Sequence, residues 1–407
     1  MRILVLSQYF WPESFIINDI VRILEAQGHT VVVATGKPNY PDGKVFPGYR
    51  ALGTQRESYL ERIEVLRVPV WPRRNGGALN LSLNYLSFVI AGLTCLPWML
   101  RKYDFDAILV FAPSPVTQVI PAILLKSLKR ARLALWVQDL WPDSLAATGY
   151  VRNRHLLWLA GRMVRRIYRH CDALLVQSRA FIEPVAHYAE RDKIHYYPNS
   201  IDVHTDNAAV AIPEELERVL KQNFCVVFAG NLGTAQALDI LVQAAEQLRD
   251  EPDIRLVVIG SGSRLDWLRA QQQALGLDKL IIAGRFPTGA MPAIFAQASA
   301  LLVSLKDEPA FAQTIPSKIQ AYLAAGRPIL ASINGEGARV VSEAGAGLVS
   351  PAGQVQPLVE NIRRMKHLGA ERRAAMGAAG RMYFDAHFDM HRQVAALVEH
   401  LSGTTES

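Results

Sequence analysis

Short apolar runs alternate with amphipathic segments through both halves of the chain, and this alternation restricts its fold more than any other feature. Residues 2–6 and 30–34 read as strands, and residues 16–26 between them read as a helix that ends at Gly28. A strand–helix–strand unit of this length implies parallel pairing with a right-handed crossover. Strands that are buried on both faces are expected to be continuous apolar runs, as they are here. The sequence therefore predicts an α/β protein built on parallel sheets.

The same pattern continues to the end of the chain, which is long enough for two domains at 407 residues. Further strands are expected at 106–111, 133–137, 173–177, 224–229, 255–259, 280–283 and 301–305, and helices at 154–170, 237–248, 264–275 and 291–298. Residues 203–220 combine a proline with several acidic residues and are expected to form a linker. We therefore expect one doubly wound domain at 1–203, a second at 204–380, and a C-terminal helix at 381–407 that packs back toward the first domain.

Residues 304–330 carry the clearest local signal for a binding site. An apolar strand is followed by an aperiodic loop, Pro316 stands where a first helical residue often does, and Gly326 is placed to end the helix. The N-terminus of such a helix presents free N–H groups and a positive potential, with Ser317 and Lys318 beside it. This combination suits a diphosphate. The alternative for Lys318 is a solvated lysine in the first turn, a position that is slightly unfavourable for a cation.

The charge of the chain is uneven, and this limits the class of partner. Residues 1–205 hold 25 Lys and Arg against 16 Asp and Glu, whereas residues 206–407 hold 19 against 21. A basic first half suits nucleic acid, anionic lipid or a phosphorylated substrate. We expect no nucleic acid partner, because no recognised nucleic-acid-binding module is present. Three widely separated cysteines fit neither a disulfide framework nor a zinc site, and the short apolar run at 3–6 does not fit a signal peptide. A cytoplasmic location is expected.

Two segments of the first half raise the question of a membrane. Residues 75–100 contain no charged residue and are long enough to span a bilayer, but six polar or proline positions interrupt them. They are expected to form a buried helix, a helix lying in the membrane interface, or a span. Residues 154–170 predict an amphipathic helix with four arginines on its polar face. That face is either merely solvated or attracted to an anionic lipid surface.

Polar residues that follow strands are candidates for the site, because ligands of parallel sheets bind at the carboxyl ends of the strands. These positions include the loops 9–18 and 36–48 and Asp139, which follows the strand 133–137. Asp139 is a candidate catalytic carboxylate, with a structural role at the start of the next helix as the alternative. The pair Asp104 and Asp106 spells a metal-binding DxD pattern, but it precedes a strand and is expected to be a solvated strand entry. The glycine loops 230–234 and 260–262 are weak evidence for nucleotide binding when taken alone.

Several motifs together resemble the retaining glycosyltransferases of family 4. The segment PESFIINDIVRILEAQGHTVVVAT resembles the opening of that family, PNSID its interdomain signature, and IPSKIQAYLAAGRPIL its nucleotide-sugar loop and helix. NYPDG, QDLWPDS, GNLGTAQ and TIPSKIQAYLA resemble the WbuB-type and WcaI-type branch. The resemblance covers nearly the whole chain and implies the GT-B fold, in which two doubly wound Rossmann-like domains face a central cleft.

The resemblance also implies a function. The branch is similar to enzymes that transfer an N-acetylated amino sugar, such as N-acetyl-L-fucosamine, from a UDP-sugar to a lipid-linked saccharide during surface polysaccharide synthesis. The expected acceptor is an undecaprenyl-diphosphate-linked saccharide, and the expected location is the cytoplasmic face of the inner membrane. No metal and no other cofactor is expected, because the motifs contain no metal-binding pattern. The implied sites are catalytic residues Asp139, Lys318 and Gln313; donor-binding residues Gly233, Thr234, Gly284, Arg285, Phe286, Thr314, Ser317 and Lys318; and acceptor-side residues Glu13, Asn18 and Tyr40.

The chain departs from the family pattern at several charged positions. Two glutamates normally stand eight positions apart in the donor-binding motif, and here those positions hold Gln313 and Ala321. The basic pair that normally follows the glycine-rich loop is absent, and Asn231 and Gln236 stand near its place. Gln138 replaces a histidine that often precedes the aspartate corresponding to Asp139. These departures leave open a non-catalytic, membrane-associated assembly subunit. A UDP-sugar 2-epimerase is a second alternative, because such enzymes share the same two-domain architecture.

Overall fold

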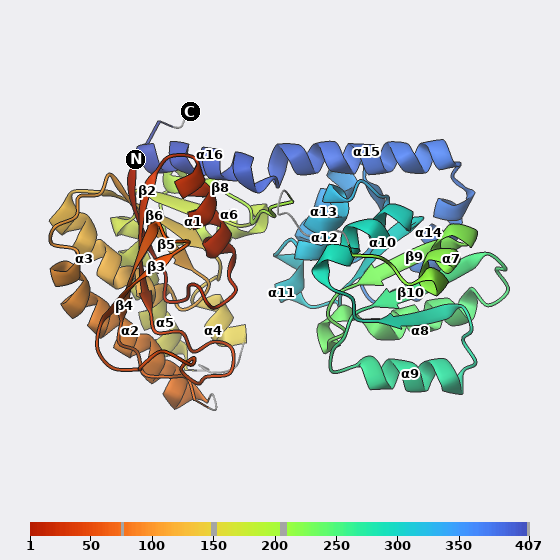
Figure 1. Ribbon diagram of the computed structural model, residues 1–407, viewed down its shortest axis with the longest axis horizontal. Coiled ribbons are helices and arrows are strands. Elements are labelled where there is room, and N and C mark those ends of the chain that lie inside the picture. Colours follow the sequence, from red (N-terminus) through yellow and green to blue (C-terminus); the bar gives the residue numbers. More distant parts are fainter. Residues whose placement is uncertain (75–76, 148–152, 204–209, 405–407) are drawn as a thin grey trace. The chain divides into compact units, whose positions relative to one another are not determined.

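The computed structural model describes residues 1–74, 77–147, 153–203 and 210–404. These residues divide into two compact units, Met1–Asn199 with Met390–Ser407, and Ser200–Asp389. Each unit is an α/β layer structure around one sheet (Figure 1). The first boundary lies four residues before the predicted one, and the chain returns to the first unit at Met390 rather than at residue 381. Residues 204–209 of the predicted linker lie outside the described residues.

Unit 1 contains an eight-stranded sheet in the order β3-β4-β2-β1-β5-β6-β7-β8, parallel except for the antiparallel pair of β3 and β4. Its strands are β1 (Arg2–Leu6), β2 (Thr30–Gly36), β3 (Gln55–Tyr59), β4 (Ile63–Val68), β5 (Ala107–Ala112), β6 (Arg132–Val137), β7 (Ala173–Val176) and β8 (Ile194–Tyr196). Its helices are α1 (Ile16–Ala26), α2 (Ala78–Met99), α3 (Ile120–Lys129), α4 (Asp143–Ala147), α5 (Arg154–His170), α6 (Ile182–Ala186) and α16 (Met390–Ser402).

Helices cover both faces of this sheet. α2, α3 and α5 bury apolar side chains against one face, and α1 and α16 against the other. α16, at the blue end of the colour scale in Figure 1, packs beside α1 although the two are far apart in the sequence. The predicted return of the C-terminal segment to the first unit therefore describes α16, whereas α15 (Ala370–His387) belongs to unit 2.

Unit 2 contains a six-stranded parallel sheet in the order β11-β10-β9-β12-β13-β14. Its strands are β9 (Phe224–Ala229), β10 (Ile254–Ile259), β11 (Leu280–Gly284), β12 (Ala300–Ser304), β13 (Ile329–Ser332) and β14 (Gly347–Ser350). Its other helices are α7 (Glu214–Gln222), α8 (Leu238–Gln247), α9 (Leu265–Ala274), α10 (Met291–Gln297), α11 (Pro309–Ala312), α12 (Ser317–Ala324), α13 (Gly335–Glu343) and α14 (Val355–His367). α8, α9 and α14 cover one face, and α7, α10, α12, α13 and α15 the other.

The strand order of each sheet reverses at one point, between β1 and β5 in unit 1 and between β9 and β12 in unit 2. Loops that leave neighbouring strands diverge there, so the carboxyl edge of each sheet is where a ligand is expected to bind. The α/β fold class with two doubly wound units is as predicted. α7 corrects the prediction of a linker at 203–220, because Leu216 and Leu220 are buried one helical turn apart.

Candidate functional site

The glycine loops after β9 and β10 approach each other closely at the carboxyl edge of unit 2. Gly230 and Gly260 have φ angles of 133° and 140°, which only glycine adopts readily. A Cβ on Gly260 would stand 1.8 Å from the carbonyl oxygen of Gly230. The loops are joined by backbone hydrogen bonds from Gly230 N–H to the Ile259 oxygen and from Leu232 N–H to the Ser261 oxygen. The absence of a side chain at Gly260 allows the two loops to lie this close together.

A cavity of about 350 Å³ opens beside these loops. Its lining residues come from the ends of β9, β10 and β11 and from the start of α10, and they are Gly230, Asn231, Ile259, Gly260, Ser261, Arg285, Phe286 and Met291. Arg285 is exposed and Phe286 is half-buried, so the cavity combines a cation with an aromatic face. A cavity of this size and composition fits a small polar ligand with an aromatic part, such as a nucleoside.

Lys318 extends from the first turn of α12 toward the loop after β9. A Cβ on Gly230 would lie 2.7 Å from the Lys318 Cε, so a side chain at this position would displace the Lys318 side chain. The Lys318 Nζ donates a hydrogen bond to the Gln236 Oε1 at 2.6 Å and lies 3.6 Å from the centroid of the Phe228 ring. No carboxylate of the described residues forms an ion pair with it. Burial lowers the pKa of Lys318 to about 7.

The remaining predicted donor residues lie on the same edge of unit 2. Gly233 and Thr234 precede and begin a 3-10 turn, Thr234–Gln236, whose last side chain bonds Lys318. Gly284 ends β11 with a φ of 81° and precedes the two cavity residues. Gln313, Thr314 and Ser317 occupy the segment before α12 and its first residue. The structure thus places the predicted donor-side residues in the loop after β9, at the end of β11, and in the segment that leads into the N-terminus of α12.

Two departures from the family pattern have a visible structural outcome. Gln236, near the place of the missing basic pair, supplies the acceptor that holds Lys318 in position. Ala321 packs against the apolar core on the inner side of α12. The sequence prediction missed Asn231 and Ser261 as cavity residues, although both stand in the glycine loops that were noted. The signal that could have found them is the convergence of those loops at adjacent strand ends.

In unit 1, Glu13 and Asn18 hold the loops of the carboxyl edge together. The buried Glu13 carboxylate accepts hydrogen bonds from the backbone N–H groups of Asn39, Tyr40 and Phe10, at 2.8, 2.7 and 3.3 Å. Asn18 donates to the Glu13 carbonyl at 2.7 Å and accepts from the Trp11 N–H at 3.1 Å. Burial raises the pKa of Glu13, and the three N–H donors oppose that shift. Glu13 and Asn18, two of the three predicted acceptor-side residues, therefore position backbone in this structure.

Tyr40 belongs to an aromatic cluster with a guanidinium in it. Its ring lies 5.8 Å from that of Tyr9 and 5.3 Å from that of Phe15, measured between centroids. The Arg73 guanidinium stands 5.2 Å from the Tyr40 ring and 5.6 Å from the Tyr9 ring, and it donates to the Tyr85 hydroxyl. Arg73 makes no ion pair with a carboxylate of the described residues. The sequence prediction passed over this residue, which lies at the same edge as Tyr40.

Arg67 is a second residue that the prediction missed. It is fully buried at the end of β4 and pairs with the Glu57 carboxylate. Its guanidinium also donates to the carbonyl oxygen of Gly36, the last residue of β2, and to that of Trp11 in the loop after β1. Arg67 therefore fixes the loops that carry the acceptor-side residues. The pattern of the sequence gave no sign that a strand arginine would be buried here.

Asp139 follows β6 and is half-buried. Its carboxylate accepts hydrogen bonds from the Trp141 Nε1 at 3.1 Å and the Ser144 Oγ at 3.2 Å. Ser144 lies in the short helix α4, so Asp139 restrains the start of that helix as well as facing the carboxyl edge. Burial raises the pKa of the Asp139 carboxyl. A carboxyl group in this setting is suited to accept a proton.

The amides beside Asp139 form a closed network. Gln138 donates to the Asn199 Oδ1 at 2.9 Å, Asn199 donates to the Gln177 Oε1 at 3.0 Å, and Gln177 donates to the Gln138 carbonyl at 2.7 Å. These residues follow β6, β7 and β8, so the network ties three neighbouring strand ends together. Gln138 thus has a positioning role at the place where the family often has a histidine.

Asp104 and Asp106 lie at the opposite edge, before β5, as predicted. Both carboxylates pair with Arg2, at 3.6 and 2.9 Å. In the part of the chain that the structure describes, no group of three or more His, Cys, Asp or Glu side chains is placed to hold a metal ion.

Each unit matches a family of glycosyltransferase domains. Residues 15–200 match the glycosyl transferase 4-like domain, and residues 212–383 match the glycosyl transferases group 1. WcaI of Escherichia coli (strain K12), whose name describes it as a putative glycosyl transferase of colanic acid biosynthesis, is 27% identical to this chain over 346 residues. The match covers 80% of this chain and 82% of WcaI. A GDP-mannose-dependent alpha-(1-6)-phosphatidylinositol monomannoside mannosyltransferase of Mycobacterium tuberculosis (strain H37Rv) is 25% identical over 314 residues, 75% of this chain and 78% of the relative.

Solved structures show the same fold. The crystal structure of Anabaena Alr3699/HepE in complex with UDP superimposes with a TM-score of 0.69 at 16% identity and covers 99% of this chain and 100% of HepE. At that identity the likeness bears on the fold alone. The two domain matches account for both units, and the chain is a glycosyltransferase with the GT-B fold.

Proposed function

We propose that the protein transfers an N-acetylated amino sugar, such as N-acetyl-L-fucosamine, from a UDP-sugar to an undecaprenyl-diphosphate-linked saccharide. The reaction would take place at the cytoplasmic face of the inner membrane and contribute to a surface polysaccharide. The colanic acid role in the name of WcaI and the UDP bound to HepE support this choice. The GDP-mannose dependence in the name of the mycobacterial relative makes the identity of the nucleotide the first point to test.

The observation that carries the proposal is the cavity of unit 2 with Lys318 beside it. The base would lie in the cavity near Phe286, with Arg285 at its edge. The diphosphate would lie at the N-terminus of α12, where the Lys318 ammonium and free backbone N–H groups face it. Phosphate charge that develops on the leaving group would be stabilised by these preorganised groups, and no metal is required by the proposal. Gln313 and Thr314 precede this helix; Gln313 would contact the transferred sugar, and Thr314 would contact the diphosphate.

The acceptor would bind at the carboxyl edge of unit 1. The Arg73 guanidinium, which lacks a carboxylate partner among the described residues, offers a positive site between two aromatic rings. Aromatic faces bind the apolar faces of sugars, and a guanidinium binds phosphate oxygens in pairs. Asp139 would accept a hydrogen bond, or a proton, from the reacting hydroxyl of the acceptor. Glu13 and Asn18 would act indirectly, through the loops that they fix.

The test is a transfer assay with UDP-N-acetyl amino sugars, run with and without a lipid-linked saccharide. The proposal predicts UDP release and an elongated lipid product only when the acceptor is present. A 2-epimerase would convert the UDP-sugar with no acceptor, and a non-catalytic assembly subunit would produce no change in either case. Either of those results would refute the proposed transfer.

A further inference from the structure

Three helices of unit 1 form one outer layer. α2, α3 and α5 bury their inner sides in the same core cluster on one face of the sheet. α2 packs against α3, and α3 packs against α5. The outer sides of the three helices therefore form a continuous face of unit 1 on the far side from the core.

This layer carries most of the large apolar side chains that unit 1 exposes. They are Leu79, Leu86, Ile90 and Trp98 on α2, Leu128 on α3, and Leu156, Trp158 and Leu159 on α5. Trp98 and Trp158 are 63% and 59% exposed. Single exposed apolar residues are ordinary, but their concentration on one layer marks an interaction surface.

The packing of α2 decides between the alternatives that the sequence left open for the uncharged residues 78–99. Among the described residues it is the one helix that passes the length and composition test for crossing a membrane, and 33% of its most apolar window is buried. Phe88, Leu96 and Met99 pack into the core of the sheet, so α2 is held against a folded domain on one side. That packing is incompatible with a bilayer span and leaves its outer side uncovered. Burial, one of the three alternatives, therefore describes only the inner side of α2.

Lys and Arg are present on the helices of this layer, whereas Asp and Glu are absent from them. The sequences of α2, α3 and α5 contain no Asp or Glu. Basic side chains stand on α3 and α5, namely Lys126, Lys129, Arg154, Arg162, Arg165, Arg166 and Arg169. The four arginines at 162–169 make no ion pair with a carboxylate of the described residues. Such a surface attracts an anionic partner.

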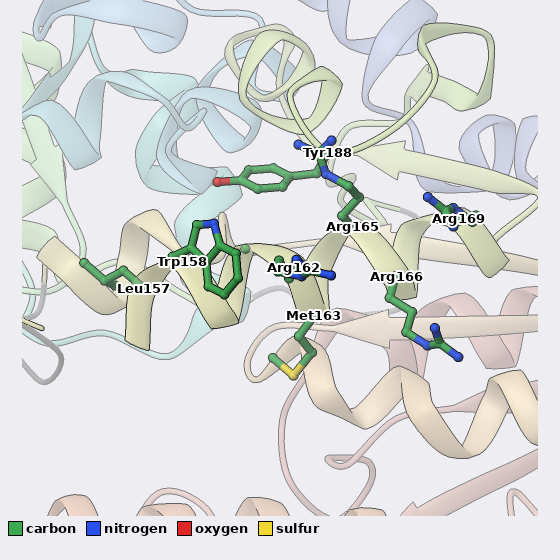
Figure 2. A pocket seen from close by; sticks show the side chains of 9 residues that line it. Leu157, Trp158, Arg162, Met163, Arg165, Arg166, Arg169 and Tyr188 are labelled. Atoms are coloured by element: carbon green, nitrogen blue, oxygen red, sulfur yellow. The ribbon is translucent and has the colours of Figure 1, made fainter. Parts of the chain in front are cut away.

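A groove of about 740 Å³ runs along α5, and its lining is both cationic and aromatic. Figure 2 shows Trp158, Arg162, Arg165, Arg166 and Tyr188 around it. The Arg162 guanidinium lies 4.9 Å from the Trp158 ring. The Arg101 guanidinium, which follows the end of α2, lies 4.4 Å from the ring of Trp98 in the last turn of that helix. In each of these pairs an apolar indole ring and a guanidinium cation lie side by side on the surface. That arrangement matches the boundary between the acyl chains and the phosphates of a bilayer.

We propose that the outer face of α2, α3 and α5 is the surface on which the protein docks to an anionic phospholipid bilayer, and that the groove along α5 receives lipid phosphates. The exposed Trp and Leu side chains enter the headgroup boundary, and the arginines of α5 pair with phosphate oxygens. The inference rests on the proposed function for its biological setting, since that function places the acceptor in a membrane. The residues that support it all lie in unit 1.

The test is co-sedimentation of the full chain with vesicles of phosphatidylcholine alone and of phosphatidylcholine with phosphatidylglycerol at a ratio of about 7:3. We expect binding to the anionic vesicles that weakens as salt rises, because surface charges are screened. The double variant Arg162→Glu, Arg166→Glu should lower the partition coefficient by about thirtyfold or more, given the contribution of each basic residue near an anionic surface. Trp98→Ser with Trp158→Ser tests the apolar part separately and should also weaken binding.

The matched control is Arg372→Glu with Met382→Ser, two exposed residues of α15 in unit 2, which should bind vesicles like the unaltered chain. Nucleotide-induced shifts in melting temperature are recorded for every variant, so that loss of docking is separated from loss of donor binding and from unfolding. Equal binding by the arginine variant, or no binding to anionic vesicles by the unaltered chain, would overturn the inference. So would self-association of the unaltered chain that the arginine variant abolishes, because a second copy would then cover this face.

Discussion

The Lys318 Nζ lies 2.6 Å from the Gln236 Oε1, and this hydrogen bond joins the N-terminus of α12 to the turn after β9. A neutral amide holds the lysine without neutralising it. A carboxylate in the place of Gln236 would form an ion pair and reduce the positive potential available to a diphosphate. The pairing therefore keeps a buried amine in a defined position, where an anionic ligand would favour its ammonium form.

Lys318→Ala is expected to lower kcat by about 10²–10³, the loss that follows removal of one charge-stabilising group from a transition state. Steady-state kinetics of transfer would measure it. Lys221→Ala, which removes an exposed lysine of α7 that pairs with Glu217, should leave kcat unchanged. Turnover by Lys318→Ala at the level of that control would remove Lys318 from the site.

The lowered pKa of Lys318 predicts that donor binding depends on pH. With a pKa of about 7 caused by burial, the amine of the unliganded protein is mostly neutral at pH 8. A bound diphosphate favours the ammonium form, so the binding of UDP at pH 8 should be accompanied by uptake of a proton by the Lys318 amine. The Kd for UDP should then rise by up to about tenfold per pH unit above pH 7. Calorimetry in buffers of different ionisation enthalpy measures this uptake. Lys318→Met should abolish it, and a Kd independent of pH in the unaltered chain would contradict the assignment.

The same shift has a consequence for stability in the absence of ligand. Between about pH 7 and the ordinary lysine value of 10.5, the unfolded chain holds the Lys318 proton more tightly than the folded chain does. The free energy of unfolding should therefore rise with pH across this window, as far as Lys318 contributes. Denaturant titrations of the unaltered chain and of Lys318→Met isolate that contribution, which should be absent from the variant. Parallel pH profiles for the two proteins would refute it.

Gly260→Ala is expected to lower the free energy of unfolding by about 3 kcal/mol or more, because it combines a disallowed φ of 140° with overlap against the Gly230 carbonyl oxygen. Gly276→Ala is the matched control. Its φ is 56°, and no atom lies within 4 Å of the added Cβ, so it should cost only about 1 kcal/mol. Urea denaturation of both variants makes the comparison. Equal costs would show that the close approach of the two loops is not required.

Arg73→Ala is expected to raise the KM for the acceptor by about tenfold or more and to leave UDP affinity unchanged, since the residue lies in unit 1 and binds an anionic group in the proposal. Arg73→Lys keeps the charge but loses the planar stacking on Tyr9 and Tyr40. Its KM for the acceptor should therefore lie between those of the unaltered chain and of Arg73→Ala. Initial-rate kinetics with varied acceptor measure both. An unchanged KM for Arg73→Ala would make its role structural.

Asp139→Asn is expected to lower kcat strongly with little change in melting temperature, because asparagine can still accept from Trp141 and Ser144 but cannot take a proton. Asp143→Asn, at the exposed start of α4, is the control for effects on that helix. Full activity of Asp139→Asn would leave Asp139 with the helix-positioning role alone.

The sequence predicted elements well where proline, glycine and apolar periodicity agreed. α1 and α5 have the predicted bounds, and α12 ends before Gly326 as expected. α12 begins at Ser317, one residue after the predicted first helical residue Pro316, which is its N-cap. α7 was missed because acidic residues and a proline suggested a linker, whereas its stability comes from burial of Leu216 and Leu220. Tertiary packing of this kind is not visible in local composition.

Positions at the strand edges could be predicted, but the direction of each side chain could not. Glu13 was expected to face the acceptor, and it instead accepts three backbone N–H groups inside its own loop. Arg67 and Arg73 carried no motif, and their places depend on pairings between β4, β2 and the following loops. These pairings join residues far apart in the sequence, so the site residues of unit 1 needed the structure more than those of unit 2 did.

The most direct test of the account is calorimetric and thermal-shift titration of the purified protein with UDP, GDP, dTDP and ADP. A ligand that binds only the folded state stabilises it by about 2.7 kcal/mol at 100 times its Kd, which is visible as a rise in melting temperature. The account predicts a selective response to UDP that Lys318→Ala weakens. No response to any of the four nucleotides would contradict a donor site in the cavity of unit 2, and a response selective for GDP would contradict the proposed UDP-sugar donor.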